Sequence, residues 1–443
     1  MKIALISPRG IGMGSQEENK KTESIYNELS NIESLKELMA CPNSPLLTIG
    51  AMATPYFDDV IYIDEEIEAI DFSKYYDVIG MSFMTQQASR AYELSVQFKK
   101  LGSYIIAGGM HPTNLPDQTL EYFDTVFVGE CEDTWDQFIT DFKKGCPKRI
   151  YKNNQLIDME KVVMPRYDLL KMDAYKTIPV QISRGCPHNC TFCASTKVYG
   201  PKYRHKSVEQ VINEVKYIQT LKKNPHIYFT DDNMLVSKAF SKALISSLQG
   251  MGIRWMTHTD IGIADNEDVL KLLYASGCRK LVIGFESITP ASLEKLEKWK
   301  YNKLQEYGHA IEKIQSYGIG VWGTFIVGLD NDDKDVFQKV IDFTLGNNLY
   351  GAMISVPTPF PGSELYNQLD KANRILTKHW GSYTLWNVVV KPKNMSKEEL
   401  EEGFEYVLKS IYSKEAAAKR IEHFKHLYCK RRNGNENNSV ARS

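Results

Sequence analysis

Short apolar runs alternate with longer amphipathic stretches through the first 150 residues. The runs predicted to be strands are Lys2–Ser7, Asp58–Ile63, Asp77–Ser82, Tyr104–Ala107 and Thr125–Val128. Residues 87–101 have the apolar spacing of a helix between two of these strands. Strands that alternate with helices predict a doubly wound parallel sheet. Ligands of such sheets bind outside the carboxyl ends of the strands, so the loops at those ends are candidate contact sites.

A second alternating series begins near residue 176. Its predicted strands are Val180–Ser183, His226–Thr230, Arg254–His258, Lys280–Glu286, Gly320–Val327 and Ala352–Pro357. Amphipathic helices such as residues 208–221 and 266–276 lie between them. Repeated strand–helix units predict a partial β/α barrel with its site at the C-terminal ends of the strands.

The pattern therefore divides the chain into four predicted parts. Residues 1–150 form the doubly wound domain, 151–175 a linker and 176–370 the partial barrel. Residues 371–443 form a mainly helical region, and we expect its polar end, from Cys429 onward, to be disordered.

Composition narrows the class of protein. A chain of 443 residues exceeds one ordinary core, so two or three domains are expected. The net charge of −1 offers no electrostatic basis for binding nucleic acid. The apolar runs are too short to span a bilayer, and the chain starts with a strand-like segment rather than a signal sequence. Most of the eight cysteines are scattered singly, which suits a reducing compartment, and we expect a cytoplasmic protein.

Three cysteines in one short segment carry the strongest chemical signal. Cys186, Cys190 and Cys193 have the spacing C-x3-C-x2-C, and Phe192 stands directly before the last of them. A cubic iron–sulfur cluster held entirely by protein takes four cysteines, so three would leave one iron open to a reactant. Zinc with a nearby histidine as fourth ligand is the alternative interpretation. A disulfide framework is disfavoured because the remaining cysteines are dispersed.

This spacing, with the preceding Arg-Gly pair and the aromatic residue, resembles the signature of the radical S-adenosylmethionine enzymes. The resemblance implies a 4Fe-4S cluster on the three cysteines and S-adenosylmethionine on the open iron. It also implies contacts to S-adenosylmethionine from the cysteine segment and from later strand ends. These residues are Phe192, Asp231 or Asp232, Glu286, Ile326 and Gly328. In this family the acidic pair would hold the amino group, Glu286 the ribose hydroxyls, and Gly328 would let the adenine approach the backbone.

The first domain resembles the cobalamin-binding domain of the cobalamin-dependent radical S-adenosylmethionine subfamily. The resemblance rests on Asp77–Gly80, Ala107–Thr113 and Val128–Glu130. It implies cobalamin contacts from residues at strand ends, with the nucleotide tail in the paired-glycine loop. These residues are Thr85, Gly108, Gly109, Gly129 and Glu130. The pattern D-x-H-x-x-G, in which a histidine coordinates cobalt, is absent, so we predict cobalamin without a histidine on cobalt. His111 is a candidate for a helix cap or turn, or for a direct metal role.

The resemblance implies that the cluster cleaves S-adenosylmethionine to a 5′-deoxyadenosyl radical, which abstracts hydrogen from an unreactive carbon. No catalytic acid–base residue is predicted. The expected outcome is methylation of a small-molecule or lipid substrate through cobalamin, with a flavodoxin or ferredoxin as electron donor. A cobalamin-associated radical cyclisation or rearrangement remains open. So does a methylthiotransferase, which would need a second cluster from Cys41, Cys131 and Cys146, and so does a zinc-stabilised binding module without enzymatic activity.

Overall fold

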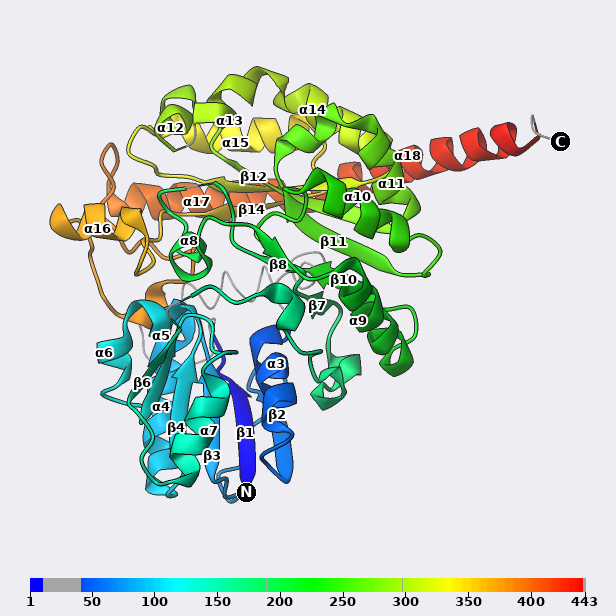
Figure 1. Ribbon diagram of the computed structural model, residues 1–443. Helices are drawn as coiled ribbons and strands as arrows, with labels where there is room; N and C mark the ends of the chain where they lie inside the picture. Colours follow the sequence, from blue (N-terminus) through cyan, green and yellow to red (C-terminus); the bar gives the residue numbers. More distant parts are fainter. Residues whose placement is uncertain (11–40, 154, 189, 297, 441–443) are drawn as a thin grey trace. The chain divides into compact units, whose positions relative to one another are not determined.

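The computed structural model describes residues 1–10, 41–153, 155–188, 190–296 and 298–440 (Figure 1). They belong to two compact units. The first comprises Met1–Asp232 and Thr358–Thr384, and the second comprises Asn233–Pro357 and Leu385–Ser443. The predicted fold class is confirmed: a parallel sheet at the N-terminus is followed by further parallel strand–helix units and a helical C-terminal region.

The unit boundaries differ from the predicted limits at residues 150, 175 and 370. The sequence pattern assigns residues 151–232 to a linker and the start of the barrel, yet they pack with the N-terminal sheet. The Tyr175 hydroxyl donates a hydrogen bond to Asp64 over 2.8 Å. Residues 358–384 return to the same unit, where Trp380 Nε1 donates to Gln118 Oε1 at 3.0 Å. Contacts between such distant positions leave no trace in a local hydrophobic pattern.

The N-terminal sheet of the first unit is parallel throughout, with the strand order β2-β1-β3-β4-β5-β6. The strands are β1 (Lys2–Ser7), β2 (Asp59–Asp64), β3 (Val78–Ser82), β4 (Tyr104–Gly108), β5 (Thr125–Val128) and β6 (Ile150–Lys152). The order is flavodoxin-like, and the direction in which strands are added reverses between β1 and β3. Both strands are buried almost end to end, as expected of a parallel sheet covered on both faces. The edge strand β6 is absent from the sequence prediction because three residues carry too little pattern.

Helices pack against this sheet in the first unit. They are α3 (Ser44–Ala53), α4 (Ala88–Lys100), the short α5 (Met110–Asn114) and α6 (Pro116–Thr119), and α7 (Trp135–Lys143). Trp135 Nε1 of α7 donates to the carbonyl oxygen of Met52 in α3, so these two helices lie side by side.

The rest of the first unit carries the cysteine segment. Its elements are β7 (Ile178–Val180), β8 (Ser183–Arg184), α8 (Ser195–Tyr199), β9 (Arg204–His205), α9 (Val208–Leu221) and β10 (His226–Phe229). Strand β7 pairs in parallel with β10, and β8 pairs antiparallel with β9. The predicted strand Val180–Ser183 is interrupted because the Asp231 carboxylate, rather than a neighbouring strand, accepts hydrogen bonds from the N–H groups of Ile182 and Ser183.

The second unit has a parallel sheet in the order β14-β13-β12-β11. Its strands are β11 (Arg254–Thr259), β12 (Cys278–Glu286), β13 (Gly320–Ile326) and β14 (Gly351–Ser355). Its longer helices are α10 (Lys238–Ser247), α11 (Glu267–Ala275), α14 (Tyr307–Ser316), α15 (Asp335–Gly346) and α17 (Lys397–Ile411). Ser396 and Glu399 form a capping box at the start of α17.

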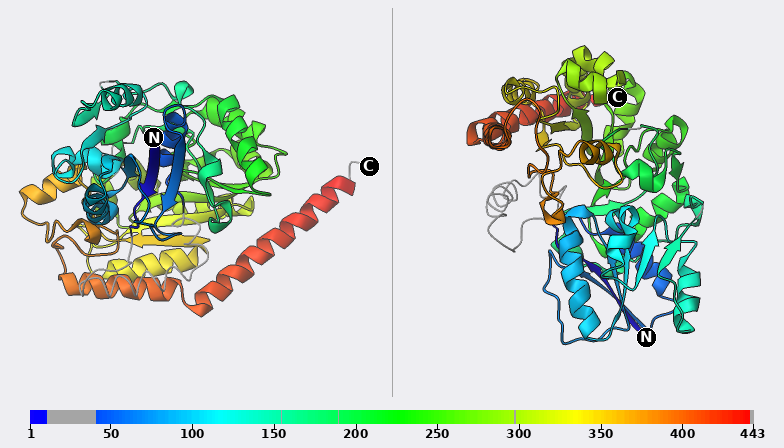
Figure 2. Two further views of the ribbon diagram at one scale, coloured as in Figure 1. Left: turned by 90° about the horizontal axis from the view of Figure 1, so that it is seen from below. Right: turned by 90° about the vertical axis from the view of Figure 1, so that its left-hand side faces the viewer.

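The sequence pattern predicts a disordered C-terminal end, whereas the structure has a helix there as far as Val440. Helix α18 (Lys414–Val440) continues through that part of the chain and is seen along its length in Figure 2. Polar composition was the basis of the prediction, but no proline interrupts residues 414–440, and polar residues are compatible with an exposed helix. No helix in the described ranges is both long and apolar enough to cross a membrane.

Candidate active site

The cysteine loop, residues 185–194, lies between β8 and α8. Gly185 turns the chain at the start of the loop with φ of 88°, a conformation that glycine adopts freely. A β-carbon at Gly185 would overlap the carbonyl oxygen of Lys202, so glycine lets the loop pass the segment that leads to β9. The N–H of Cys193 donates to the carbonyl oxygen of Cys190 at 3.1 Å and folds the second half of the loop into a turn.

None of the three loop cysteines forms a disulfide, and all three are half-buried. The pKa of Cys193 is raised, first by loss of water around the thiol and then by the nearby Asp232 carboxylate. Within the described ranges, no three side chains of Cys, His, Asp or Glu converge as a metal site. Metal binding itself supplies the energy that gathers thiolates. Three half-buried thiols on one short loop, none of them in a disulfide, fit the ligands of a cluster with one open iron.

Two adjacent carboxylates follow β10, and the structure separates their roles. Asp231 is buried and accepts hydrogen bonds from Ile182 N–H at 3.2 Å and from the Ser183 hydroxyl at 2.5 Å. Burial raises the pKa of Asp231 to about 7. Asp232 is exposed and close enough to Cys193 to affect the pKa of its thiol. Asp231 therefore braces the base of the cysteine loop, whereas Asp232 can face a cationic ligand beside it.

A cavity lies at the carboxyl ends of the N-terminal strands, where ligands of doubly wound sheets bind. Its apolar walls include Leu5, Leu46, Met81, Ile106 and Phe127. Its polar walls include Ser82, Glu130, Glu132, Arg184 and Tyr199. The space of about 100 Å³ is small beside typical ligand pockets of roughly 300–1,000 Å³, so it suits one ring of a larger ligand.

The glycines predicted to touch cobalamin are not equivalent. Gly108 and Gly129 line the cavity, and a β-carbon on Gly108 would approach only Phe127, at 3.9 Å. Gly109 also lines the cavity, but it has φ of 100° and a β-carbon there would lie 2.8 Å from the backbone of Phe83. Packing of the chain on itself thus explains why position 109 is glycine. Thr85 is buried and is not among the residues that line the cavity.

His111 is a core residue of α5 rather than an exposed cap or turn residue. Its side chain is fully buried, and its Nε2 lies 2.9 Å from the Tyr92 hydroxyl. The imidazole packs against the rings of Phe83 and Trp380. Burial lowers the pKa of His111 to about 4, so the ring is neutral near pH 7. It is not among the residues that line the cavity.

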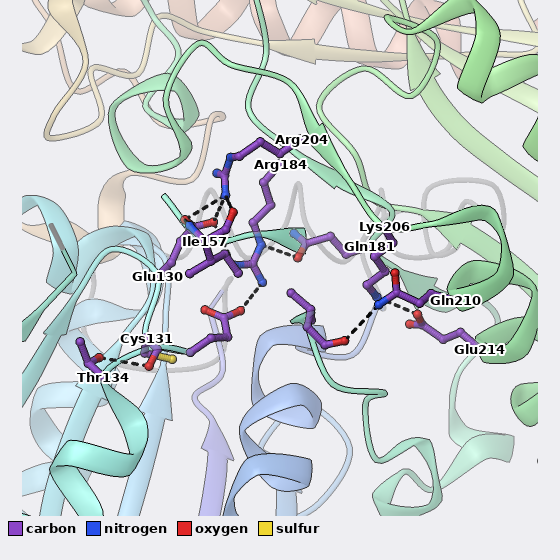
Figure 3. Close-up of polar contacts among 12 residues, drawn as sticks. Glu130, Cys131, Thr134, Ile157, Gln181, Arg184, Arg204, Lys206, Gln210 and Glu214 are labelled. Carbon is purple, nitrogen blue, oxygen red and sulfur yellow. Dashed lines mark hydrogen bonds and ion pairs between the residues drawn. The ribbon is translucent and has the colours of Figure 1, made fainter. Parts of the chain in front are cut away.

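Glu130, also predicted to touch cobalamin, is paired with two arginines of the chain itself. Arg184 directly precedes the cysteine loop, and Arg204 lies in β9 after it (Figure 3). The Arg204 side chain is only 9% exposed. Sequence reasoning also missed Glu132, which pairs with Arg184 at 2.7 Å. The run of acidic residues 130, 132 and 133 at a strand end was the signal that could have revealed it.

The predicted contacts in the second unit lie at the ends of β12 and β13. Glu286 follows a bulge, has φ of 63° and accepts a hydrogen bond from Lys300 Nζ at 3.1 Å. A non-glycine residue held in this strained region marks a functional candidate. Ile326 is the last residue of β13. At Gly328, with φ of 89°, a β-carbon would lie 2.5 Å from Leu400 of α17, so packing within the unit explains this glycine.

Comparison with known proteins gives the site its context. Residues 180–344 match the family described as the radical SAM superfamily, and residues 363–442 match a domain of unknown function, DUF4070. The chain is 30% identical over 387 residues to bacteriochlorophyllide d C-12(1)-methyltransferase of Chlorobaculum tepidum, covering 85% of this chain and 84% of the relative. It is 26% identical over 348 residues to the hopanoid C-2 methylase of Rhodopseudomonas palustris, covering 76% of this chain and 65% of the relative.

A solved structure shares the fold. TsrM from Kitasatospora setae, a radical S-adenosylmethionine methyltransferase with cobalamin and a 4Fe-4S cluster bound, has a TM-score of 0.63 at 14% identity. The match covers 84% of this chain and 75% of TsrM. A three-cysteine loop on parallel strand–helix units defines the class of radical S-adenosylmethionine enzymes. The chain belongs to the cobalamin-dependent radical S-adenosylmethionine enzyme family. As an enzyme of this family it is not the zinc-stabilised binding module considered from sequence.

Proposed function

We propose that this protein is a cobalamin-dependent radical S-adenosylmethionine C-methyltransferase that acts on an unactivated carbon of a small-molecule or lipid substrate. The relative from Chlorobaculum tepidum is named as a methyltransferase of a tetrapyrrole, and the one from Rhodopseudomonas palustris as a methylase of a hopanoid lipid. Both names describe methylation of a large, mainly apolar ring system. A substrate of that kind is the class we propose.

One observation carries the proposal: residues on both sides of the cysteine loop line the cavity of the N-terminal sheet. Arg184 lines the cavity and stands two residues before Cys186, and Tyr199 lines it from the end of α8, the helix that follows the loop. A ligand that enters the cavity therefore lies next to the segment that would carry the cluster. Methylation through cobalamin needs both cofactors close to one substrate, and this arrangement supports it.

Each group of residues has a distinct role in the proposal. The three loop cysteines hold the cluster, and Asp232 accepts the amino group of S-adenosylmethionine beside them. Phe192, Glu286, Ile326 and Gly328 remain predicted contacts of S-adenosylmethionine. When bound, the cluster supplies the electron that cleaves S-adenosylmethionine, and cobalamin supplies the methyl group. The mainly apolar cavity takes the nucleotide tail of cobalamin and keeps water from it.

The cobalt is proposed to have no histidine ligand from the first unit. His111 is the histidine of the paired-glycine loop, and its Nε2 is already engaged by the Tyr92 hydroxyl in the core. Freeing it would break that hydrogen bond and expose an apolar ring cluster. This supports the proposal that the protein binds cobalamin through its nucleotide tail and the edge of its ring, without a histidine on cobalt.

Anaerobic reconstitution with iron, sulfide and hydroxocobalamin tests the function. With reductant and S-adenosylmethionine carrying a deuterated methyl group, the protein should form 5′-deoxyadenosine and a product that carries the label. Bacteriochlorophyllides and hopanoids are the first substrates to test. Cleavage with substrate consumption but no label in the product would favour the radical cyclisation or rearrangement. No cleavage at all would refute the proposal.

The methylthiotransferase alternative finds no support in the described ranges. It needs a second cluster, but Cys41, Cys131 and Cys146 lie on three separate segments of the chain, unlike the three cysteines of the one loop. None of the eight cysteines forms a disulfide in the described part of the chain, which supports the cytoplasmic location that we propose. A flavodoxin or ferredoxin is the proposed electron donor.

A further inference from the structure

Four charged side chains form a compact group at the end of β5, which we name the β5 ion cluster: Glu130, Glu132, Arg184 and Arg204. Figure 3 labels Glu130 and the two arginines. Glu130 Oε1 accepts hydrogen bonds from Nη1 of Arg184 and from Nη1 of Arg204, each at 3.0 Å. The Glu130 side chain is 2% exposed and both arginine side chains are 9% exposed. Glu130 is therefore the buried centre of the group.

The β5 ion cluster also binds the backbone of neighbouring segments. Glu130 Oε2 accepts from the N–H of Ile157 at 3.0 Å, and Arg204 Nη1 donates to the carbonyl oxygen of Ile157 at 2.7 Å. Arg204 Nη2 donates to the carbonyl oxygen of Tyr199 at 3.0 Å. The two carboxylates and two guanidinium groups sum to zero charge. Removing one member would leave a buried charge without compensation, which is costly.

The position of the β5 ion cluster joins two sites. Arg184 precedes the cysteine loop directly, and Arg204 follows it in β9, so Glu130 holds the chain at both ends of the loop. Glu130, Glu132 and Arg184 also line the cavity of the N-terminal sheet. The buried Glu130 carboxylate thus binds the two arginines that flank the cysteine loop, and Glu130 also lines the cavity.

We propose that Glu130 is a positioning residue through which a ligand in the cavity changes the redox potential of the iron–sulfur cluster. The proposal rests on the proposed function, because it takes the cavity as part of the corrinoid site. Arg184 lines the cavity and its side chain is 9% exposed, so a ligand in the cavity removes the remaining water from its pair with Glu130. The lower local dielectric strengthens the ion pairs. Stronger ion pairs hold the cysteine loop and the positive charge of Arg184 beside it in one position.

This coupling has a reciprocal consequence. If corrinoid shifts the potential of the cluster, the redox state of the cluster must change the affinity for corrinoid by the matching factor. Occupancy of the cavity would then control when the cluster can be reduced. Reduction without corrinoid wastes S-adenosylmethionine, so such control would benefit the enzyme.

The test is a redox titration of the reconstituted protein, followed by electron paramagnetic resonance of the cluster with and without hydroxocobalamin. In the unaltered protein, hydroxocobalamin should shift the midpoint potential. In Glu130→Gln two arginines face one carboxylate, so the potential should rise and the shift caused by hydroxocobalamin should be lost. Glu132→Gln is the matched control. It removes an equal charge from the same group but leaves Glu130 bound to both arginines, so the shift should persist.

A double variant separates charge from position. Glu130→Gln with Arg204→Gln leaves one arginine facing one carboxylate, so the group is neutral again and holds no uncompensated buried charge. Its potential without corrinoid should return close to that of the unaltered protein, while the shift stays lost. Iron content per chain shows that the compared samples carry the cluster.

Two results would overturn the coupling: hydroxocobalamin binds the unaltered protein without changing the potential, or the double variant retains the full shift. Failure of the unaltered protein to bind hydroxocobalamin is a different result. It would refute the proposed function, and with it the coupling.

Discussion

Replacing Gly185 with alanine should push the start of the cysteine loop away from the segment that leads to β9. Gly185 has φ of 88°, and a residue with a β-carbon in this region costs roughly 1–2 kcal/mol. The new β-carbon would also overlap the carbonyl oxygen of Lys202, and overpacking of this kind typically costs ~1–3 kcal/mol. The two costs arise from different atoms, so the free energy of unfolding should fall by about 2–5 kcal/mol.

Gly145→Ala is the matched control for this experiment. Gly145 lies in the same unit with φ of 72°, but a β-carbon there would meet nothing within 4 Å. This variant should therefore lose only about 1–2 kcal/mol. Urea unfolding followed by tryptophan fluorescence measures both losses, and iron content after anaerobic reconstitution reports on the loop. Equal losses of stability together with equal iron content in the two variants would refute the reasoning.

Further expectations follow from the same site. Serine at any of the three loop cysteines should abolish the charge-transfer absorbance of the cluster and the cleavage of S-adenosylmethionine; a variant that keeps both would contradict the ligand assignment. Asp232→Asn should weaken the binding of S-adenosylmethionine, measured by equilibrium dialysis, whereas Asp231→Asn should mainly lower the melting temperature because its backbone donors lose a charged acceptor. The reverse order of effects would exchange their roles. Gly108→Trp should fill the cavity and reduce the uptake of hydroxocobalamin, and unchanged uptake would place the corrinoid elsewhere. Burial lowers the pKa of His111 to about 4 in the folded protein. In the unfolded chain His111 has its ordinary, higher pKa and takes up a proton first, so the folded state loses stability as the pH falls below that value. The expected loss is roughly 2 kcal/mol between pH 7 and pH 5, and His111→Phe, compared by urea unfolding at both pH values, should lack this part of the loss.

The sequence by itself determined the class of this protein, because the class depends on local features. The spacing of Cys186, Cys190 and Cys193 is a property of ten residues, and it indicated an iron–sulfur centre with one open iron. The alternation of strands and helices is also local, and it predicted two regions of parallel strands. Neither inference needs to know which distant residues touch.

Only the tertiary structure decided the roles of individual side chains, because each role depends on a partner far away in the sequence. Asp231 and Asp232 are adjacent in the chain, yet one binds the base of the cysteine loop and the other faces solvent. At Gly328, the position of Leu400 gives a reason for glycine that the sequence does not reveal. Glu130 meets arginines more than fifty residues further along the chain. A hydrophobic pattern records whether a residue is buried, but the identity of its neighbours is set by how the strands and loops pack.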